Sequence, residues 1–486
     1  MSTTQISIRR SLVWMALSQG GLFVLQFGGS VVISRLLTPY ELGVYAVAAA
    51  IVGILSLIRA FGLQAFLIRE VELTPELTAS AFTINALLAL LTAVFVVILA
   101  HASSAALAEP GVRGVMLLLA LIPIIGVFEF LPGVRLERIG AFHIVATVNF
   151  LRVLVSTLLT VWLATIGYSY TSIAYGTLAS GLVTAICINI VGWRFVSLRI
   201  GFTDWRRITR FGLQLLTISA IGNIAIRLTD LLVARLIGIS ALGLYSRAFG
   251  LNNLLWDNLH MVIGRIVFVD FAERQRRGLP LRDIYLRIVA MVTGFLWPAF
   301  AGLAILAGPI ILTIYGPAWT GAAFPLSMLA IAGLVLTAAT MTGEVFLVTG
   351  DTARLARFQF KRSVFGILVV TVGCFFGLNA AAGARIIEAV GTLLFAKEDL
   401  KRMTGTVTAD YPRIYAQSAA LTITACAPTA LVMASYDWAF DTSLPQLFVA
   451  ILVGLICWAA LLWRFRHPLY LEAAAVIRSR LNVVRN

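Results

Sequence analysis

Charge is scarce in this sequence. Only 12% of the 486 residues are charged, whereas 60% are hydrophobic, and the mean hydropathy is +0.96. A soluble domain does not need so much apolar sequence, because its surface must be covered by polar side chains. The composition therefore excludes a soluble protein and predicts a chain that crosses a membrane many times.

Reactive and ligand-binding motifs are also missing. The four cysteines, at positions 187, 374, 426 and 457, lie in apolar stretches without CxxC or Cys/His spacing, which favours packing over disulfides or metal binding. No GxxxxGK[ST], HExxH or GxSxG pattern occurs. We therefore expect no enzyme activity, no cofactor and no metal.

Long apolar runs are what the sequence has in place of these motifs. A spanning helix needs about 20 apolar residues, and the chain divides into fourteen such stretches. We predict an all-α polytopic membrane protein with about 14 transmembrane helices. The expected spans are 11–34, 42–66, 78–100, 112–134, 141–166, 171–193, 211–236, 242–268, 284–306, 320–348, 358–378, 382–397, 414–436 and 445–465.

Basic residues fall on one side of these spans. With the N-terminus inside, 28 of the 37 basic residues lie in inner segments, and only Arg35, Arg113, Arg235 and Arg385 are expected outside. Cytoplasmic loops collect Arg and Lys, so the net charge of +15 indicates membrane orientation and not nucleic-acid binding. We predict both termini in the cytoplasm. The Arg9-Arg10 pair flanks helix 1, which is too long for a cleaved signal peptide.

An eleven-residue phrase occurs twice, 200 residues apart. Arg35-Leu36-Leu37-Thr38-Pro39-Tyr40-Glu41-Leu42-Gly43-Val44-Tyr45 aligns without a gap to Arg235-Leu236-Ile237-Gly238-Ile239-Ser240-Ala241-Leu242-Gly243-Leu244-Tyr245. The offset matches helices 1–2 to helices 7–8, so two six-helix lobes are expected to be related by a parallel repeat. The predicted divisions are an N-lobe (1–193), a basic linker (194–210), a C-lobe (211–400), helices 13–14 (401–466) and a basic cytoplasmic tail (467–486), which is either an amphipathic helix or a solvated end.

Polar residues form stripes on the duplicated helices. Helix 7 carries Thr217, Ala220, Asn223, Arg227, Asp230 and Ala234, and helix 8 carries Ser246, Gly250, Asn253, Asp257, His260 and Gly264. Helix 2 repeats the pattern with Tyr45, Ala49, Gly53, Ser56 and Arg59, and helix 1 offers Gln19, Gln26, Ser30 and Ser34. Such spacings place side chains on one helix face. The stripes favour a shared aqueous cavity, with close helix packing as the alternative.

Charges within the membrane are the candidate site residues, since they are costly unless they face a cavity or a partner. The substrate-binding candidates are Arg59, Arg152, Arg227, Arg247 and Asn253. Each arginine also has an alternative role that involves no substrate. Arg227 could pair with Asp230 one turn away, Arg247 could extend outward to the membrane surface, and Arg152 could bond to backbone carbonyls. The candidates for proton coupling are Asp257, His260 and Asp230, although a single His is more often a packing residue.

Five phrases in order carry a family resemblance. They are the first repeat copy, Arg227-Leu228-Thr229-Asp230, the segment from Ala241 to Ala248, the segment from Pro298 to Leu303, and Tyr315-Gly316-Pro317-Ala318-Trp319. Together they resemble the polysaccharide-export, or Wzx-type, branch of the multidrug/oligosaccharidyl-lipid/polysaccharide (MOP) flippases. The resemblance implies two lobes around a cavity lined by helices 1, 2, 7 and 8. It also implies transport of undecaprenyl-pyrophosphate-linked sugars across the bacterial inner membrane. Unlike some relatives, this chain has no arginine within helix 1, so Arg59, Arg227 and Arg247 are left to bind the pyrophosphate.

The leading hypothesis is therefore a flippase for lipid-linked oligosaccharide repeat units, which serves exopolysaccharide, capsule or O-antigen synthesis by alternating access. Its expected partners are the lipid-linked substrate, bilayer lipid and polysaccharide polymerase machinery. The alternatives are a drug or small-metabolite exporter of the same superfamily, for which unpaired carboxylates are expected, and a membrane-bound polymerase or glycosyltransferase. The last would need a large extramembrane loop or a carboxylate motif, and the sequence shows neither.

Overall fold

The structure is a computed structural model that describes residues 3–57, 59, 62–107, 109–472 and 474, and their side chains except at 3–19, 104–107, 214–220 and 257–269. The described residues form α-helices and short 3-10 helices, with no strand among them. They divide into two compact units, Met1–Gly243 and Leu244–Asn486. Ten stretches of the described chain are long and apolar enough to cross a membrane. Four further long helices, α1, α9, α10 and α15, complete the fourteen predicted spans, so the predicted fold class is confirmed.

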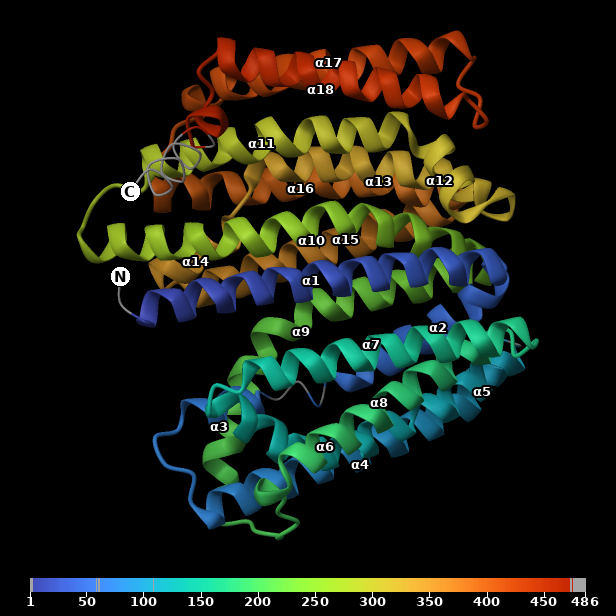
Figure 1. Ribbon diagram of the computed structural model, residues 1–486, viewed down its shortest axis with the longest axis vertical. Helices are drawn as coiled ribbons and strands as arrows, with labels where there is room; N and C mark the ends of the chain where they lie inside the picture. Colours follow the sequence, from blue (N-terminus) through green and yellow to red (C-terminus); the bar gives the residue numbers. More distant parts are fainter. Residues whose placement is uncertain (1–2, 58, 60–61, 108, 473, 475–486) are drawn as a thin grey trace. The chain divides into compact units, whose positions relative to one another are not determined.

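The first unit is built from helices α1 to α9 and the start of α10. In Figure 1, α7 and α8 lie side by side, α6 packs against α8, and α4 packs against α6. The helices are α1 (Thr3–Leu36), α2 (Pro39–Ser56), α3 (Leu63–Arg69), α4 (Pro75–Leu107), α5 (Pro110–Leu119), α6 (Leu121–Arg138), α7 (Phe142–Thr165), α8 (Thr171–Val191), α9 (Trp205–Leu236) and α10 (Ile239–Arg276).

The second unit contains the rest of α10 and eight further helices, with α17 packed on α11 and α18 on α17 (Figure 1). These are α11 (Arg282–Ile305), α12 (Ala307–Tyr315), α13 (Ala323–Leu336), α14 (Thr342–Thr349), α15 (Thr352–Cys374), α16 (Leu378–Thr404), α17 (Tyr411–Ser435) and α18 (Leu444–Arg464). The first unit includes α9, which the repeat assigns to the predicted C-lobe. The lobe boundaries therefore stay a prediction.

The duplicated phrase forms the same structure twice. Helices α1 and α9 end at Leu36 and Leu236, and helices α2 and α10 begin at Pro39 and Ile239, with the offset of the repeat preserved. The two starts use different chemistry. Thr38 caps α2 in a capping box with Glu41, whereas Gly238 precedes α10 with a φ of 131°, a conformation that glycine adopts without strain.

The two copies also contact each other reciprocally, through residues that all belong to the first unit. A Cβ atom added to Gly43 would lie 2.0 Å from the carbonyl oxygen of Ile239, and one added to Gly243 would lie 1.9 Å from that of Pro39. Because residue 43 meets 239 and residue 243 meets 39, the contact has the symmetry of an isologous interface. Glycine is required at both positions, since no side chain fits between the backbones.

Helix 2 is shorter than predicted. The sequence suggests a span of 42–66, but α2 ends at Ser56, and α3 begins only after Gly62, which has a left-handed φ of 64°. Arg59 therefore lies in the intervening turn, where its backbone N–H donates to the Ser56 carbonyl. The prediction that Arg59 lies on the face of a continuous helix 2 is wrong, because α2 ends at Ser56 and a new helix, α3, begins at Leu63 after the left-handed Gly62.

Candidate functional site

Arg59 lines an open cavity whose walls all belong to the first unit. The cavity has a volume of about 650 Å³ and is lined by residues of α3, α4, α6, α7 and α8 together with the α2–α3 turn. Its polar lining residues are Arg59, Gln64, Asn85, Glu129, Glu137 and Thr184. Gln64 and Glu137 are joined by a hydrogen bond of 2.8 Å between Nε2 and Oε2. The remaining wall is apolar, as small-molecule sites commonly are.

Two buried donors in this cavity have no acceptor. The Nε of Arg59 and the Nδ2 of Asn85 are buried, and neither forms a hydrogen bond with any described residue. Asn85 is only 4% exposed. Buried polar groups are nearly always paired, because an unmade hydrogen bond costs about 1–3 kcal/mol. Both unmatched groups are N–H donors of residues that line the cavity, so an acceptor bound there would lie close to them.

A glycine of α6 determines where the Arg59 guanidinium lies. A Cβ atom added to Gly126 would be 2.6 Å from Nη2 and 3.0 Å from Nη1 of Arg59. The arginine therefore packs flat against bare backbone. Glu129 lies one turn further along α6, and it interacts electrostatically with both Arg59 and Arg152, although no ion pair with either forms in the described part of the chain. Arg152 itself is exposed on α7.

Arg227 is held between α9 and α2. Its Nη1 forms an ion pair with Oδ2 of Asp230 at 3.6 Å, so the pair expected from the i, i+3 spacing is present. Its Nε would lie 3.0 Å from a Cβ atom on Gly53. Two members of the predicted stripes, Gly53 on α2 and Arg227 on α9, thus face each other in the first unit. Tyr45, one turn before Ala49 on the α2 stripe, bonds to Thr177 of α8.

The remaining candidates lie in the second unit. The guanidinium carbon of Arg247 is 5.8 Å from the ring centre of Tyr315 and 5.7 Å from that of Trp319. These cation–π contacts join two of the sequence phrases that carry the family resemblance, and they place Arg247 on aromatic rings of its own chain. Asn253 is half-buried on α10. The side chains of Asp257 and His260 lie outside the described residues.

One charged network was missed by sequence reasoning. Arg385, which the charge distribution predicts on the outer side, lies in α16. Its Nε donates to the Tyr245 hydroxyl at 2.9 Å and its Nη1 pairs with Glu388 at 2.5 Å. Arg362 of α15 lies 4.0 Å from the other oxygen of Glu388. The side chains of Arg385 and Glu388 are only 14% and 13% exposed. The i, i+3 spacing of Arg385 and Glu388 along the sequence was a signal that could have identified the pair.

No cluster suited to a metal ion, with three or more His, Cys, Asp or Glu side chains, is present among the described residues. The polar chemistry of the described regions is instead dominated by arginine. A guanidinium offers five N–H donors in a planar fork, which matches phosphate or carboxylate oxygens.

Sequence comparisons add a family and several relatives. The family described as "Polysaccharide biosynthesis protein" matches residues 32–324. An uncharacterized membrane protein in the cps region of Klebsiella pneumoniae is 23% identical over 407 residues, which cover 83% of this chain and 84% of that protein. The succinoglycan biosynthesis transport protein ExoT of Rhizobium meliloti is 25% identical over 68% of this chain and 67% of its own length. The lipopolysaccharide biosynthesis protein WzxC of Escherichia coli is 22% identical over 75% of both chains.

Solved structures share the fold at low sequence identity. The lipid II flippase MurJ, in an inward closed conformation, superimposes with a TM-score of 0.78 at 13% identity, covering 93% of this chain and 98% of MurJ. An inward-facing multidrug resistance MATE transporter of the MOP superfamily has a TM-score of 0.60 at 15% identity, covering 80% of this chain and 96% of that protein. The fold is therefore that of MOP-type transporters.

Proposed function

The chain belongs to the polysaccharide biosynthesis protein family, and on that premise we propose that it is a flippase for lipid-linked oligosaccharide precursors. Its multi-pass helical architecture is that of a transporter. The substrate would be an undecaprenyl-pyrophosphate-linked repeat unit that crosses the bacterial inner membrane toward the periplasm. Both termini would lie in the cytoplasm, because most basic residues flank the inner ends of the spans.

The observation that carries this proposal is the pair of buried donors in the cavity of the first unit. Arg59 and Asn85 offer N–H groups that no described residue accepts, in a volume of about 650 Å³. A pyrophosphate supplies several acceptor oxygens and negative charge, so it would satisfy both donors with charge-assisted hydrogen bonds. A neutral substrate could accept hydrogen bonds from the arginine but would bring no negative charge to it, and a cationic substrate would be repelled.

A second arginine would assist at the neighbouring helix pair. Arg227 is 44% exposed in spite of its ion pair with Asp230, so part of its guanidinium is available to a ligand. We place Arg59 and Arg227 in contact with the pyrophosphate during transport, with Arg152, Arg247 and Asn253 as secondary candidates. The sugar would occupy the aqueous path while the polyprenyl chain stays in lipid, and the transporter would work by alternating access.

Transport of an anion outward is already favoured by a membrane potential that is negative inside. The contribution is about 2.3 kcal/mol per charge per 100 mV. A coupling ion would then mainly reset the empty carrier, and Asp257, His260 and Asp230 are the candidates for carrying a proton. Asp230 is the weakest of these, because it already forms an ion pair with Arg227 at 3.6 Å.

The test is replacement of the two arginines in a strain that lacks the chromosomal copy. We expect Arg59→Ala and Arg227→Ala each to abolish polysaccharide export and to raise intracellular lipid-linked glycan at unchanged protein level. Lysine at either position should restore export only in part, since it keeps the charge but loses the fork. Arg113→Ala is the matched control, because Arg113 is exposed and contacts His101. Full export by both alanine variants would refute the proposal.

A drug-exporting function has one observation in its favour. Glu129 lines the cavity and has no ion pair among the described residues, and a carboxylate of this kind could hold a cationic compound. If this second function were correct, Glu129→Gln would lower tolerance to cationic drugs while polysaccharide export continued. If Glu129→Gln left drug tolerance unchanged but abolished polysaccharide export, the drug-exporting function would be refuted and the flippase function supported.

A further inference from the structure

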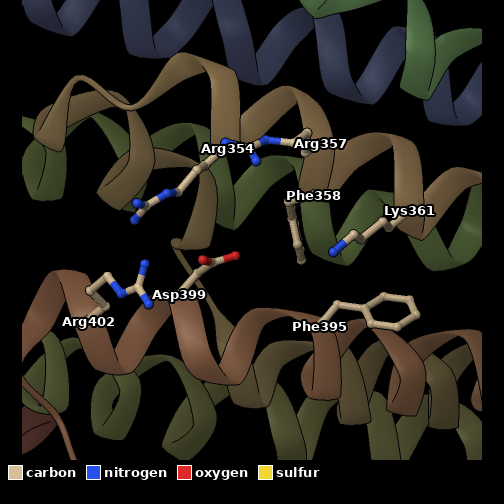
Figure 2. Close-up of a pocket in the computed structure, with 7 residues that line it drawn as sticks. All are labelled: Arg354, Arg357, Phe358, Lys361, Phe395, Asp399 and Arg402. Atoms are coloured by element: carbon tan, nitrogen blue, oxygen red, sulfur yellow. The ribbon is translucent and has the colours of Figure 1, made fainter.

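A second pocket in the protein lies between the start of α15 and the end of α16. Its volume is about 300 Å³, and its lining residues are Arg354, Arg357, Phe358, Lys361, Phe395, Asp399 and Arg402. Figure 2 shows the side chains of Arg354, Phe358, Asp399 and Arg402 extending into the gap between the two helices. The pocket belongs wholly to the second unit and shares no residue with the cavity around Arg59.

This pocket carries a surplus of positive charge. Four of its seven lining residues are basic, and Asp399 is the single acid. Arg354 is occupied by Asp351, with Nε and Oδ2 at 3.0 Å. Among the described residues, no acidic group lies within ion-pair distance of Arg357, Lys361 or Arg402. Like charges held this close repel one another, so an anion in the pocket would be stabilised.

Exposed apolar residues lie on the same two helices as the pocket. Along α15, Phe360, Val364 and Leu368 are spaced by four residues and are 58%, 39% and 60% exposed, and on α16 Leu394 is 66% exposed. Such a face on a spanning helix meets the lipid. The basic residues cluster at one end of this ridge, in segments that the charge distribution predicts to be cytoplasmic. A ligand that matched both features would have an anionic head and an apolar tail.

We propose that this pocket binds the headgroup of an anionic glycerophospholipid from the cytoplasmic leaflet. The phosphodiester would lie among Arg357, Lys361 and Arg402, and the acyl chains would lie along Phe360 and Leu368. A volume of about 300 Å³ is at the lower end of the range for small-molecule sites, which suits a phosphoglycerol head better than an oligosaccharide. Basic pockets between helices on the cytoplasmic side have this chemistry.

The site does not depend on the proposed transport function, because it requires only that the second unit span a membrane. It would hold the lipid as a fixed component of the inner-leaflet surface. The two conclusions can therefore fail separately, since lipid binding and polysaccharide export are measured in different experiments.

The experiment is a binding titration of the full-length protein in neutral detergent with dioctanoyl phosphatidylglycerol, followed by native mass spectrometry. The pocket variant is Arg357→Ala/Lys361→Ala/Arg402→Ala, and all three side chains are exposed enough to be removed without opening the core. The matched control is Lys397→Ala/Lys401→Ala/Arg413→Ala. It removes the same charge from exposed residues on the same predicted side, outside the pocket.

We expect the pocket variant to bind phosphatidylglycerol at least about tenfold more weakly than the wild type, since charge-assisted hydrogen bonds are lost, whereas the control should bind it normally. Phe360→Ala/Leu368→Ala should also weaken binding. Equal loss in the control, or equal binding of dioctanoyl phosphatidylcholine by the wild type, would overturn the proposal. Competition by glycerol 1-phosphate at the same concentration as the lipid would show a phosphate site without a lipid component. Displacement by undecaprenyl phosphate in preference to phosphatidylglycerol would assign the pocket to the transported lipid, and either result would refute the inference.

Discussion

Gly126→Ala tests whether the position of the Arg59 guanidinium matters for transport. The added methyl carbon would lie 2.6 Å from Nη2 of Arg59, whereas ordinary contact begins near 3.4 Å, so the guanidinium must move by about 0.8 Å. The displaced group is the far end of a flexible side chain, and alanine is favoured over glycine within a helix by about 0.5–1 kcal/mol. Folding should therefore be unaffected, while the donor fork is misplaced in the cavity.

A displacement near 1 Å at a binding group can cost up to about a hundredfold in rate. We expect the initial rate of polysaccharide export to fall by about tenfold, measured in a deletion strain at matched protein level. Gly133→Ala is the control, because Gly133 is also in α6 and lines the same cavity, but its added methyl would meet only Ile188 at 3.8 Å. In an Arg59→Ala background, Gly126→Ala should have no further effect. Wild-type export by Gly126→Ala, or an equal loss with Gly133→Ala, would show that the guanidinium position is not important.

Three further outcomes are expected. Gly243→Ala should lower the free energy of unfolding of the purified protein by about 1–3 kcal/mol, because the added methyl would clash with the Pro39 carbonyl. Gly250→Ala is the control, since Gly250 has open space around it. Equal melting temperatures of the two variants would contradict this prediction. Glu388→Gln should destabilise the protein by about 3 kcal/mol in the same assay, since Arg362 and Arg385 lose the acidic partner that they share among the described residues. An unchanged melting temperature would exclude that role. A reporter fused after Tyr168 should be periplasmic and one fused after Arg207 cytoplasmic, and the reverse result would overturn the predicted orientation.

The sequence by itself determined that the protein lies in a membrane, that it has about fourteen long helices, and that one helix pair is duplicated. A chain with 12% charged residues and apolar runs of spanning length must satisfy its backbone within helices, because the bilayer offers no hydrogen bonds. The repeat could also be predicted, because the turns at Thr38 and Gly238 depend on local sequence, and both join two helices at matching positions. The i, i+3 pair of Arg227 and Asp230 was predictable for the same reason.

Only the tertiary structure decided which polar groups meet. The periodic spacing of polar residues placed Arg59 on a continuous helix, but α2 ends at Ser56, before Arg59. Gly126 and Glu129 come from α6, more than sixty residues away. The sequence could not identify Asn85 as a candidate, because a single asparagine is common in helices. Only the structure shows that its buried Nδ2 has no hydrogen-bond acceptor among the described residues. The sequence predicted Arg385 on the outer side of the membrane, and only the structure showed that Glu388 and Tyr245 bind it. Local patterns fix helices, whereas the pairing of charges depends on which helix faces become neighbours, and that is a property of packing between distant segments.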